Sequence, residues 1–126
     1  MRTADRRPIA SRLSIILVLL TLVASCSWWG NTAKLTIVNR SGKDIDICSV
    51  KMSGSTISVR NLRPGGESSL LFSVKGDDHY EVMVQFADGR RFQQQVGYVT
   101  PGFNFIDTIE IRGDQVELIT HDVQKP

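Results

Sequence analysis

The chain is 126 residues long, with 41% hydrophobic residues and a formal net charge of +2 at pH 7. This length allows one compact domain with a short additional segment. From Cys26 onward there are eleven Lys and Arg against twelve Asp and Glu, so this part has a net charge of −1. A near-neutral domain creates no broad positive field, which argues against nucleic acid as a partner.

The first 25 residues have the three-part organisation of a secretory signal. A basic stretch with Arg6, Arg7 and Arg12 is followed by the uncharged apolar segment 13–24. A helix of that length spans about 18 Å, well short of the roughly 30 Å of a bilayer core. We therefore expect a signal helix that is removed, with an uncleaved membrane anchor as the alternative.

The segment Leu22-Val23-Ala24-Ser25-Cys26 places an aliphatic residue and small residues before a cysteine. It resembles the lipobox of bacterial lipoproteins. The resemblance implies that the Cys26 thiol receives a diacylglyceryl group, that a peptidase cuts between Ser25 and Cys26, and that the new amino group is acylated. Small side chains let an extended backbone enter a protease, and a thiol supplies the nucleophile for lipid transfer. No cofactor is expected besides these covalent lipids.

The resemblance also implies a location in the bacterial cell envelope, on a membrane. Each buried methylene contributes about 0.8 kcal/mol, so two or more acyl chains hold a protein firmly. In Gram-negative members of the family, aspartate after the cysteine commonly signals inner-membrane retention. Ser27 stands there in this chain, which implies the periplasmic leaflet of the outer membrane if the host is Gram-negative. Trp28 and Trp29 follow, and either lie among lipid headgroups or pack on the first strand.

Beyond this segment, apolar and polar residues alternate, and turn signals interrupt the pattern every eight to twelve residues. This period predicts β-strands, and no segment shows a convincing helical period. The predicted strands are marked, in chain order, by Leu35 and Ile37; Ile45 and Ile47; Ile57 and Val59; Leu70, Phe72 and Val74; Tyr80, Val82, Val84 and Phe86; Phe92, Val96 and Tyr98; segment 103–112; and segment 116–119. Asp88-Gly89 between two of them is a strong hairpin signal.

Eight short strands in about ninety residues predict an all-β fold, a small antiparallel two-sheet sandwich of immunoglobulin-like or transthyretin-like kind. A small closed barrel is the alternative. We expect a signal peptide over residues 1–25 and a lipidated cysteine with a short tether over 26–33. The sandwich is expected over 34–120, followed by a flexible tail over 121–126.

Two single residues need an explanation within this pattern. Asp107 occupies an apolar position in the alternation of segment 103–111. Either a bulge near Ile106 resets the register, or Asp107 points inward and needs a partner; we expect the bulge. Cys48 has no disulfide partner if Cys26 is lipidated, so it is expected to be a small buried hydrophobe.

The sequence contains no convincing catalytic set, and the chain is predicted not to be an enzyme. His121 falls in the predicted tail, which leaves His79 as the plausible general base. Asp77-Asp78-His79 resembles part of a metal site, but acidic residues are expected at a hairpin turn. We predict no metal site, and keep a His79-centred hydrolase or metal enzyme as an alternative function.

Four arginines are candidates for binding. Arg60 and Arg63 lie around one predicted turn, and Arg90 and Arg91 lie around another. If these turns share one end of the sandwich, the guanidinium groups can bind carboxylates or lipid phosphates. The alternative is ordinary charge on solvated loops.

Segment 92–98 is polar where a strand packed on both faces is apolar, and it includes Gln93 and Gln95. It predicts an edge strand that pairs with a partner, or a strand with one face in water. The sequence as a whole predicts a membrane-anchored envelope lipoprotein whose non-catalytic sandwich binds an envelope protein or another envelope component. The second alternative function is a small-ligand or lipid carrier with a cavity lined by Phe72, Phe86 and Phe105.

Overall fold

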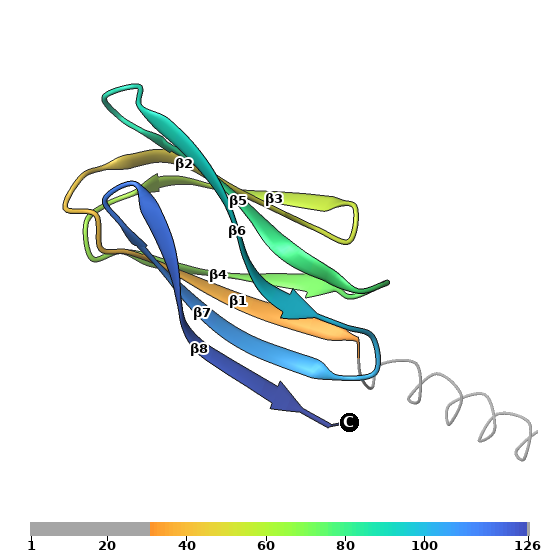
Figure 1. The fold of residues 1–126 in the computed structure, drawn as a ribbon. Helices are drawn as coiled ribbons and strands as arrows, with labels where there is room; N and C mark the ends of the chain where they lie inside the picture. The colour runs from red at the N-terminus through yellow and green to blue at the C-terminus, as the bar shows by residue number, and fades with distance from the viewer. Residues whose placement is uncertain (1–30, 126) are drawn as a thin grey trace, which may run out of the picture.

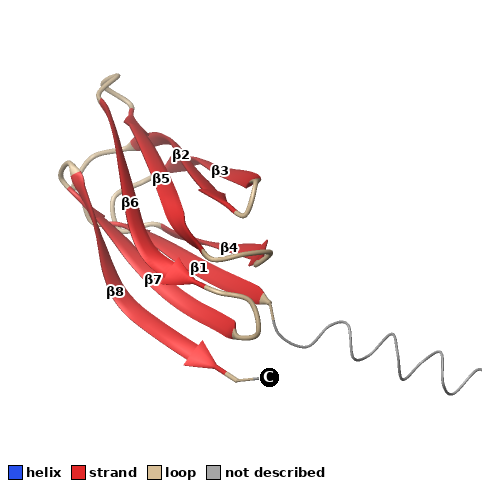
Figure 2. Cartoon of the chain, turned by 45° about the vertical axis from the view of Figure 1, so that its right-hand side comes forward, coloured by secondary structure: helices blue, strands red, loops and turns tan. Residues whose placement is uncertain are grey.

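The computed structural model describes residues 31–125, in which every regular element is a β-strand (Figures 1 and 2). The strands are β1 (Thr32–Asn39), β2 (Ile45–Met52), β3 (Ser55–Leu62), β4 (Glu67–Ser73), β5 (Asp78–Phe86), β6 (Arg91–Val99), β7 (Asn104–Arg112) and β8 (Gln115–Gln124). They form two four-stranded sheets, β4-β1-β7-β8 and β3-β2-β5-β6. The predicted eight-stranded two-sheet sandwich is confirmed, and the closed barrel is wrong.

The predicted signal peptide, the cleavage site and the lipid attachment site at Cys26 lie outside the described residues. Within residues 31–125 no helix is long and apolar enough to cross a membrane. The sandwich itself extends further than the sequence suggested at both ends. β1 begins at Thr32 rather than at residue 34, and β8 runs to Gln124, so the predicted tail is wrong for residues 121–124.

One strand pair departs from the predicted antiparallel sandwich. β1 and β7 run parallel, with Leu35 beside Asp107 and Ile37 beside Ile109, whereas the other pairs are antiparallel. Alternation of apolar residues determines which face of a strand is buried, but not its direction relative to a neighbour. Parallel neighbours need a long connection, and here the chain passes through the whole second sheet between β1 and β7.

The connections between strands lie at two opposite ends of the sandwich. We call one the four-turn end; it holds the β1–β2, β3–β4, β5–β6 and β7–β8 connections (residues 40–44, 63–66, 87–90 and 113–114). The Gly65 N–H donates to the Asn39 carbonyl at 2.7 Å. The Ala87 N–H donates to the Asp44 carbonyl at 3.0 Å. These bonds gather the turns around the β1–β2 connection.

The opposite end, which we call the terminal end, holds the beginning of β1 and the end of β8 (Figure 1). The β2–β3, β4–β5 and β6–β7 connections lie there too. The Asn31 N–H donates to the Phe103 carbonyl at 3.0 Å, and the Val74 N–H donates to the Asn31 carbonyl at 2.7 Å. The point at which the chain enters the sandwich is therefore held by two neighbouring connections.

The core lies between the two sheets. All eight strands contribute inward-facing residues, but β3 and β8 each contribute only one buried residue, Leu62 and Val116. Its fully buried members include Leu35, Ile37, Ile45, Cys48, Val50, Val82, Val84, Ile109 and Ile111. Burying one such aliphatic side chain stabilises the fold by about 1.5–3 kcal/mol. Phe72, Phe86 and Phe105 are buried in the same cluster. Phe72 and Phe105, two of the three residues proposed to line a carrier cavity, therefore pack in the core, and Phe86 packs there and also lines a pocket at the four-turn end.

Asp107 is a polar residue inside this core, with 0% of its surface exposed. The Tyr80 hydroxyl donates to Asp107 Oδ2 at 2.6 Å, and His121 Nδ1 lies 2.6 Å from Asp107 Oδ1. Tyr80 belongs to β5 and Asp107 to β7, so this bond joins the two sheets. Burial raises the pKa of Tyr80, and the bond to Asp107 raises it further, which keeps the hydroxyl protonated as a donor.

The expected bulge near Ile106 is therefore wrong, because alternation in β7 continues without a break and Asp107 points inward to partners. The irregularity lies in the neighbouring strand. Thr108 pairs with Thr120 and Ile109 pairs with Leu118, which leaves Ile119 as an extra residue of β8. This bulge shifts the second half of β8 so that His121 lies opposite Asp107.

Gly97 makes room for the Tyr80 ring. Tyr80 pairs with Val96 and Asp78 pairs with Val99, so β6 carries one extra residue in this stretch. Gly97 has a φ of +74°, and a Cβ atom built there would lie 3.1 Å from Tyr80 Cδ2. Glycine is required both for the left-handed backbone and for the close approach of the ring.

We expect Asp107→Ala to lower the free energy of unfolding by about 3 kcal/mol, because it leaves the Tyr80 hydroxyl without a partner inside the core. Tyr80→Phe should cost less, about 1–2 kcal/mol, since His121 remains beside the carboxyl group. Urea titration measures both losses. The control is Asp122→Ala on the exposed face of β8, expected to change stability by no more than about 0.5 kcal/mol. An Asp107→Ala loss as small as the control's would contradict this role.

Gly97→Ala should destabilise the protein by about 2–4 kcal/mol, because it combines backbone strain with contact against Tyr80. Gly42→Ala is the matched control: its φ is +77°, but nothing lies within 4 Å of the added Cβ. It should cost only the strain of about 1–2 kcal/mol. Thermal or urea unfolding compares the two variants, and equal losses would show that the approach to Tyr80 is unimportant.

Candidate functional site

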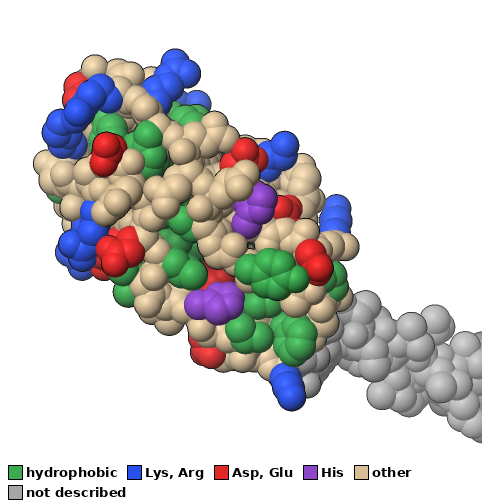
Figure 3. Space-filling model, in the orientation of Figure 1, with side chains coloured by type: hydrophobic (Ala, Val, Ile, Leu, Met, Phe, Trp, Pro, Cys, Tyr) green, Lys and Arg blue, Asp and Glu red, His purple; other side chains and the backbone are tan. Residues whose placement is uncertain are grey.

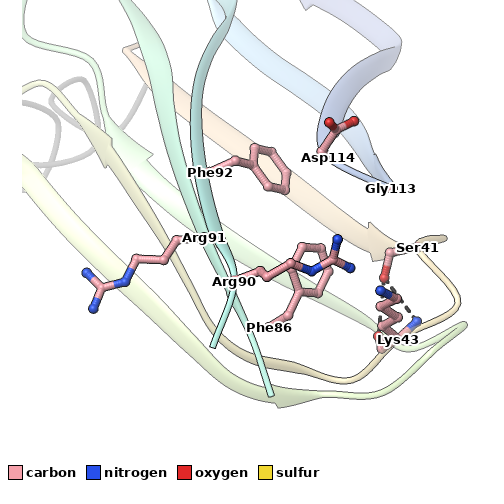
Figure 4. Close-up of a pocket in the computed structure, with 8 residues that line it drawn as sticks. All are labelled: Ser41, Lys43, Phe86, Arg90, Arg91, Phe92, Gly113 and Asp114. Carbon is pink, nitrogen blue, oxygen red and sulfur yellow. Dashed lines mark hydrogen bonds between the residues drawn. The ribbon is translucent and has the colours of Figure 1, made fainter. Parts of the chain in front are cut away.

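A pocket of about 480 Å³ opens at the four-turn end, and eight residues line it (Figure 4). They come from four separate segments: the β1–β2 connection, the end of β5, the beginning of β6 with its hairpin, and the β7–β8 turn. The lining residues are Ser41, Lys43, Phe86, Arg90, Arg91, Phe92, Gly113 and Asp114. Because the Asp88-Gly89 turn reverses the chain between β5 and β6, Phe86 and Phe92 are brought together on one hairpin.

Asn39 positions the β1–β2 side of the pocket. This buried residue at the end of β1 accepts hydrogen bonds on Oδ1 from the Ser41 N–H (3.0 Å) and from the Ser41 hydroxyl (2.7 Å). Its Nδ2 donates to the Lys43 and Leu62 carbonyls at 2.8 Å each. The side chain of Asn39 thus replaces water for four polar groups and holds Ser41 and Lys43 in place.

Phe86 and Phe92 form an apolar wall of the pocket, and the Arg90 guanidinium lies over the Phe86 ring. The Phe86 and Phe92 ring centroids are 6.0 Å apart. The Arg90 guanidinium lies 5.9 Å from the Phe86 centroid and extends into the pocket (Figure 4). A cation over an aromatic face is attracted by the ring quadrupole, so Phe86 helps to fix the direction of Arg90.

The Asp88 carboxylate accepts two hydrogen bonds from Arg90. The Arg90 N–H donates to Asp88 Oδ1 at 3.0 Å, and Arg90 Nε donates to Oδ2 at 3.2 Å. Lys43 Nζ lies 3.7 Å from the same carboxylate. The backbone N–H of Arg90 lowers the pKa of Asp88, and the Arg90 side chain contributes to this shift.

The two terminal nitrogens of Arg90 make no hydrogen bond to residues 31–125. A planar guanidinium whose Nε is already occupied still offers these donors to a carboxylate. Asp114 lies beyond Phe92 on the other side of the pocket (Figure 4). The pocket therefore combines an aromatic wall with a positive side, formed by Arg90 and Lys43, and a negative side.

The two predicted arginine turns do share one end, but the four guanidinium groups do not meet. Arg91 is one of the lining residues, but its guanidinium group points away from the pocket (Figure 4), because the side chain lies on the outer face of its sheet. Arg60 lies in the same row of that face: it pairs with Ile47, which pairs with Gln85, which pairs with Arg91. Three strand spacings, about 14 Å, separate the two arginines.

The remaining three candidates, Arg63, Gln93 and Gln95, are not among the residues that line the pocket. Arg63 lines a separate hollow beside Asp44 and Asp46. Gln93 and Gln95 lie on the outer face of β6, where Gln93 Nε2 donates to Glu81 Oε1 at 2.8 Å. β6 is an edge strand, one of the two interpretations of this segment, and its face with Gln93 and Gln95 is exposed to water, as the other interpretation requires. Its pairing with a partner stays a prediction.

An unpredicted contact closes the gap between β6 and β8. Gln94 Nε2 donates to the Val116 carbonyl at 2.8 Å, and the Val116 N–H donates to Gln94 Oε1 at 2.8 Å. The side-chain amide thus imitates a backbone pair between two edge strands of different sheets. Sequence alone could not indicate this, because the alternation only places Gln94 at an inward position beside the apolar Phe92 and Val96.

His79 and the neighbouring acids form turn contacts. His79 Nδ1 lies 3.8 Å from Asp78 Oδ1. The Ser53 and His79 backbone N–H groups bind the Asp78 carboxylate and lower its pKa, and Asp77 Oδ1 accepts the Thr100 hydroxyl at 2.6 Å. Among the described residues no three His, Cys, Asp or Glu side chains are close enough to hold a metal ion. His121, predicted to lie in a tail, is the histidine that contacts a buried carboxyl group.

No family model matches the sequence, and no curated protein does. Solved structures match the fold. An NMR structure of a protein from Eubacterium rectale aligns with a TM-score of 0.51 at 16% identity, over 71% of this chain and 87% of that one. The sandwich fold is shared with that protein.

The tip fimbrial protein Mfa3 from Porphyromonas gingivalis, with a C-terminal truncation, aligns with a TM-score of 0.44 at 9% identity. The alignment covers 75% of this chain and 51% of that one, so this chain spans about half its length. At that TM-score the overlap does not establish a shared fold.

Cys48 is fully buried on β2, as predicted for a small hydrophobe. Burial raises the pKa of its thiol from 9.0 to about 12. The thiolate is the reactive form, so the fold suppresses the reactivity of this residue in two ways, by covering it and by keeping it protonated.

We expect Cys48 in a Cys26→Ala background to resist a thiol reagent at pH 8 and to react fully in urea. The raised pKa also makes stability depend on pH. The folded state keeps a proton that the unfolded state loses above pH 9, so this contribution is present below pH 9 and is lost as pH rises toward 12. Urea titrations at several pH values should show a steeper alkaline loss than in Cys48→Val. Rapid labelling of the folded protein would contradict the prediction.

Proposed function

We propose that this chain is a lipoprotein of the bacterial cell envelope, anchored through lipid on Cys26, whose sandwich is a non-catalytic binding module. The observation that supports this most is the separation of the two ends of the domain. β1 begins at the terminal end, whereas the pocket opens at the four-turn end. Strands of eight or nine residues span about 30 Å, so an anchor beside β1 leaves the pocket directed away from the membrane.

The short segment between Cys26 and Asn31 supports the same arrangement. Even a fully extended chain reaches only about 3.6 Å per residue, so these five steps span at most about 18 Å. Asn31 is held by backbone bonds to Phe103 and Val74. The terminal end would therefore stay close to the lipid. If the host is Gram-negative, Ser27 favours the periplasmic leaflet of the outer membrane.

The chemistry of the pocket favours binding rather than catalysis. Ser41 donates its hydroxyl to Asn39 Oδ1, and no histidine lines the pocket. His79 and His121 lie toward the terminal end, on β5 and β8. A nucleophile needs a general base within hydrogen-bond reach, and the lining residues supply none to Ser41.

The partner we propose is another envelope protein that presents a carboxylate beside an apolar or aromatic side chain. The carboxylate would bind the terminal nitrogens of Arg90, with Lys43 nearby, and the apolar group would pack on Phe86 and Phe92. Charge-assisted bonds to a guanidinium are stronger than neutral ones. Arginine is also among the residues that most often dominate the energy of protein interfaces.

This proposal is tested in intact cells with a photo-crosslinking residue in place of Asp114. We expect a specific adduct with one envelope protein, reduced roughly tenfold by Arg90→Gln, which removes the charged donors that bind the carboxylate. Arg91→Gln is the matched control, since it removes the same charge from a side chain that points away from the pocket. Absence of an adduct, or equal adducts in both variants, would contradict a binding role for the pocket.

A further inference from the structure

Exposed hydrophobic side chains are concentrated near the terminal end of the sandwich. Within residues 31–125 the large hydrophobic residues with most exposure are Leu71 (65%), Tyr98 (56%), Ile119 (47%), Val123 (45%) and Ile106 (40%). Four of them lie within two residues of the terminal end of their strands; Ile119 lies in the middle of β8. We call these four residues, Leu71, Tyr98, Ile106 and Val123, the apolar band.

The band extends over two sides of the molecule. Lys34 of β1 pairs with Leu71 on one side and with Ile106 on the other, so the three form a row on the outer face of their sheet. Tyr98 is near the end of β6 and Val123 near the end of β8. Figure 3 shows hydrophobic side chains grouped at this end of the molecule. Isolated exposed hydrophobic residues need no explanation, but a group at one end calls for a partner.

We infer that the apolar band rests in the lipid surface to which the chain is anchored. This inference relies on the proposed lipid on Cys26. The chain leaves the described structure at Asn31, at the same end as the band, so a membrane that holds the anchor is the surface nearest to it. Two strand residues correspond to about 7 Å. That depth matches the 5–10 Å by which interfacial segments enter the boundary between headgroups and acyl chains.

The charges at the terminal end fit an uncharged lipid surface. Lys34, Lys51, Lys75 and Lys125 are exposed there. Asp77, Asp78, Glu81 and Asp122 balance them. Glu81 pairs with Lys51 across β2 and β5, and the Thr100 hydroxyl and backbone N–H groups bind Asp77 and Asp78. No excess of positive charge is present to require anionic lipid. Tyr98 has an apolar ring and a polar hydroxyl, the combination that favours the membrane interface, and Lys34 can extend its ammonium group toward the headgroups.

The test uses the lipid-bearing protein reconstituted in phosphatidylcholine vesicles, with the lipid confirmed by intact mass. Single cysteines at Leu71 and Tyr98 carry an environment-sensitive fluorophore, and Cys48 stays unlabelled because it is buried. Ile119→Cys is the matched control, an exposed hydrophobic position outside the band. Lipids with a nitroxide near the headgroup should quench positions 71 and 98 roughly threefold more than position 119, because only the former enter the interface. Adding phosphatidylglycerol should leave this ratio unchanged.

Equal quenching at positions 71, 98 and 119 in a protein that carries lipid would overturn the contact while leaving the proposed anchor intact. A protein without lipid on Cys26 would overturn the anchor and the contact together. A third result would also overturn the lipid contact: the stronger quenching at positions 71 and 98 than at position 119 disappears when the protein is diluted in the vesicles. In that case the band would be covered by a second copy of the chain, since contact with lipid does not depend on the surface density of protein.

Discussion

The hydrogen bond between Tyr80 and Asp107 is the constraint on which the rest of the sandwich depends. Contacts between apolar side chains of the two sheets are not directional. This 2.6 Å hydrogen bond is directional, so it fixes the position of β5 relative to β7 across the core. A carboxyl group inside the core is costly unless all of its bonding capacity is used. His121 therefore has to lie opposite Asp107, which ties the second half of β8 to the fold, and Gly97 has to leave space for the ring. The β5–β6 hairpin and the β7–β8 turn, which form part of the pocket, continue from these same four strands.

The sequence pattern was sufficient for the strands and for their inward faces, because alternation directly reflects burial. It was insufficient wherever a residue depends on a partner far along the chain. Asp107 finds Tyr80 27 residues earlier and His121 14 residues later, and neither distance is visible before the strands are paired. The bulge at Ile119 breaks the alternation of β8, so residues 121–124 resembled a tail. The parallel direction of β1 and β7 leaves no trace in either strand.

The candidate site shows the same limit. The two turns that carry the arginines do lie at one end, but adjacent residues of a strand face opposite sides. Arg90 and Arg91 consequently belong to different surfaces, one in the pocket and one on the outer face. Phe86 and Phe92 flank the hairpin that Asp88-Gly89 predicted. The sequence marked both as apolar positions of predicted strands, and an apolar residue that packs in the core and also lines a pocket gives no separate signal.

The two ends of the sandwich acquire different roles only if lipid is attached beside the terminal end, which makes Cys26 the central point of the proposal. The most direct measurement is the intact mass of the protein extracted from membranes with detergent, wild type beside Cys26→Ala. We predict a wild-type chain that begins at Cys26 and carries a diacylglyceryl group and an acyl chain, and a variant that retains residues 1–25 without lipid. A wild-type protein that begins elsewhere, or that carries no added lipid, would contradict it.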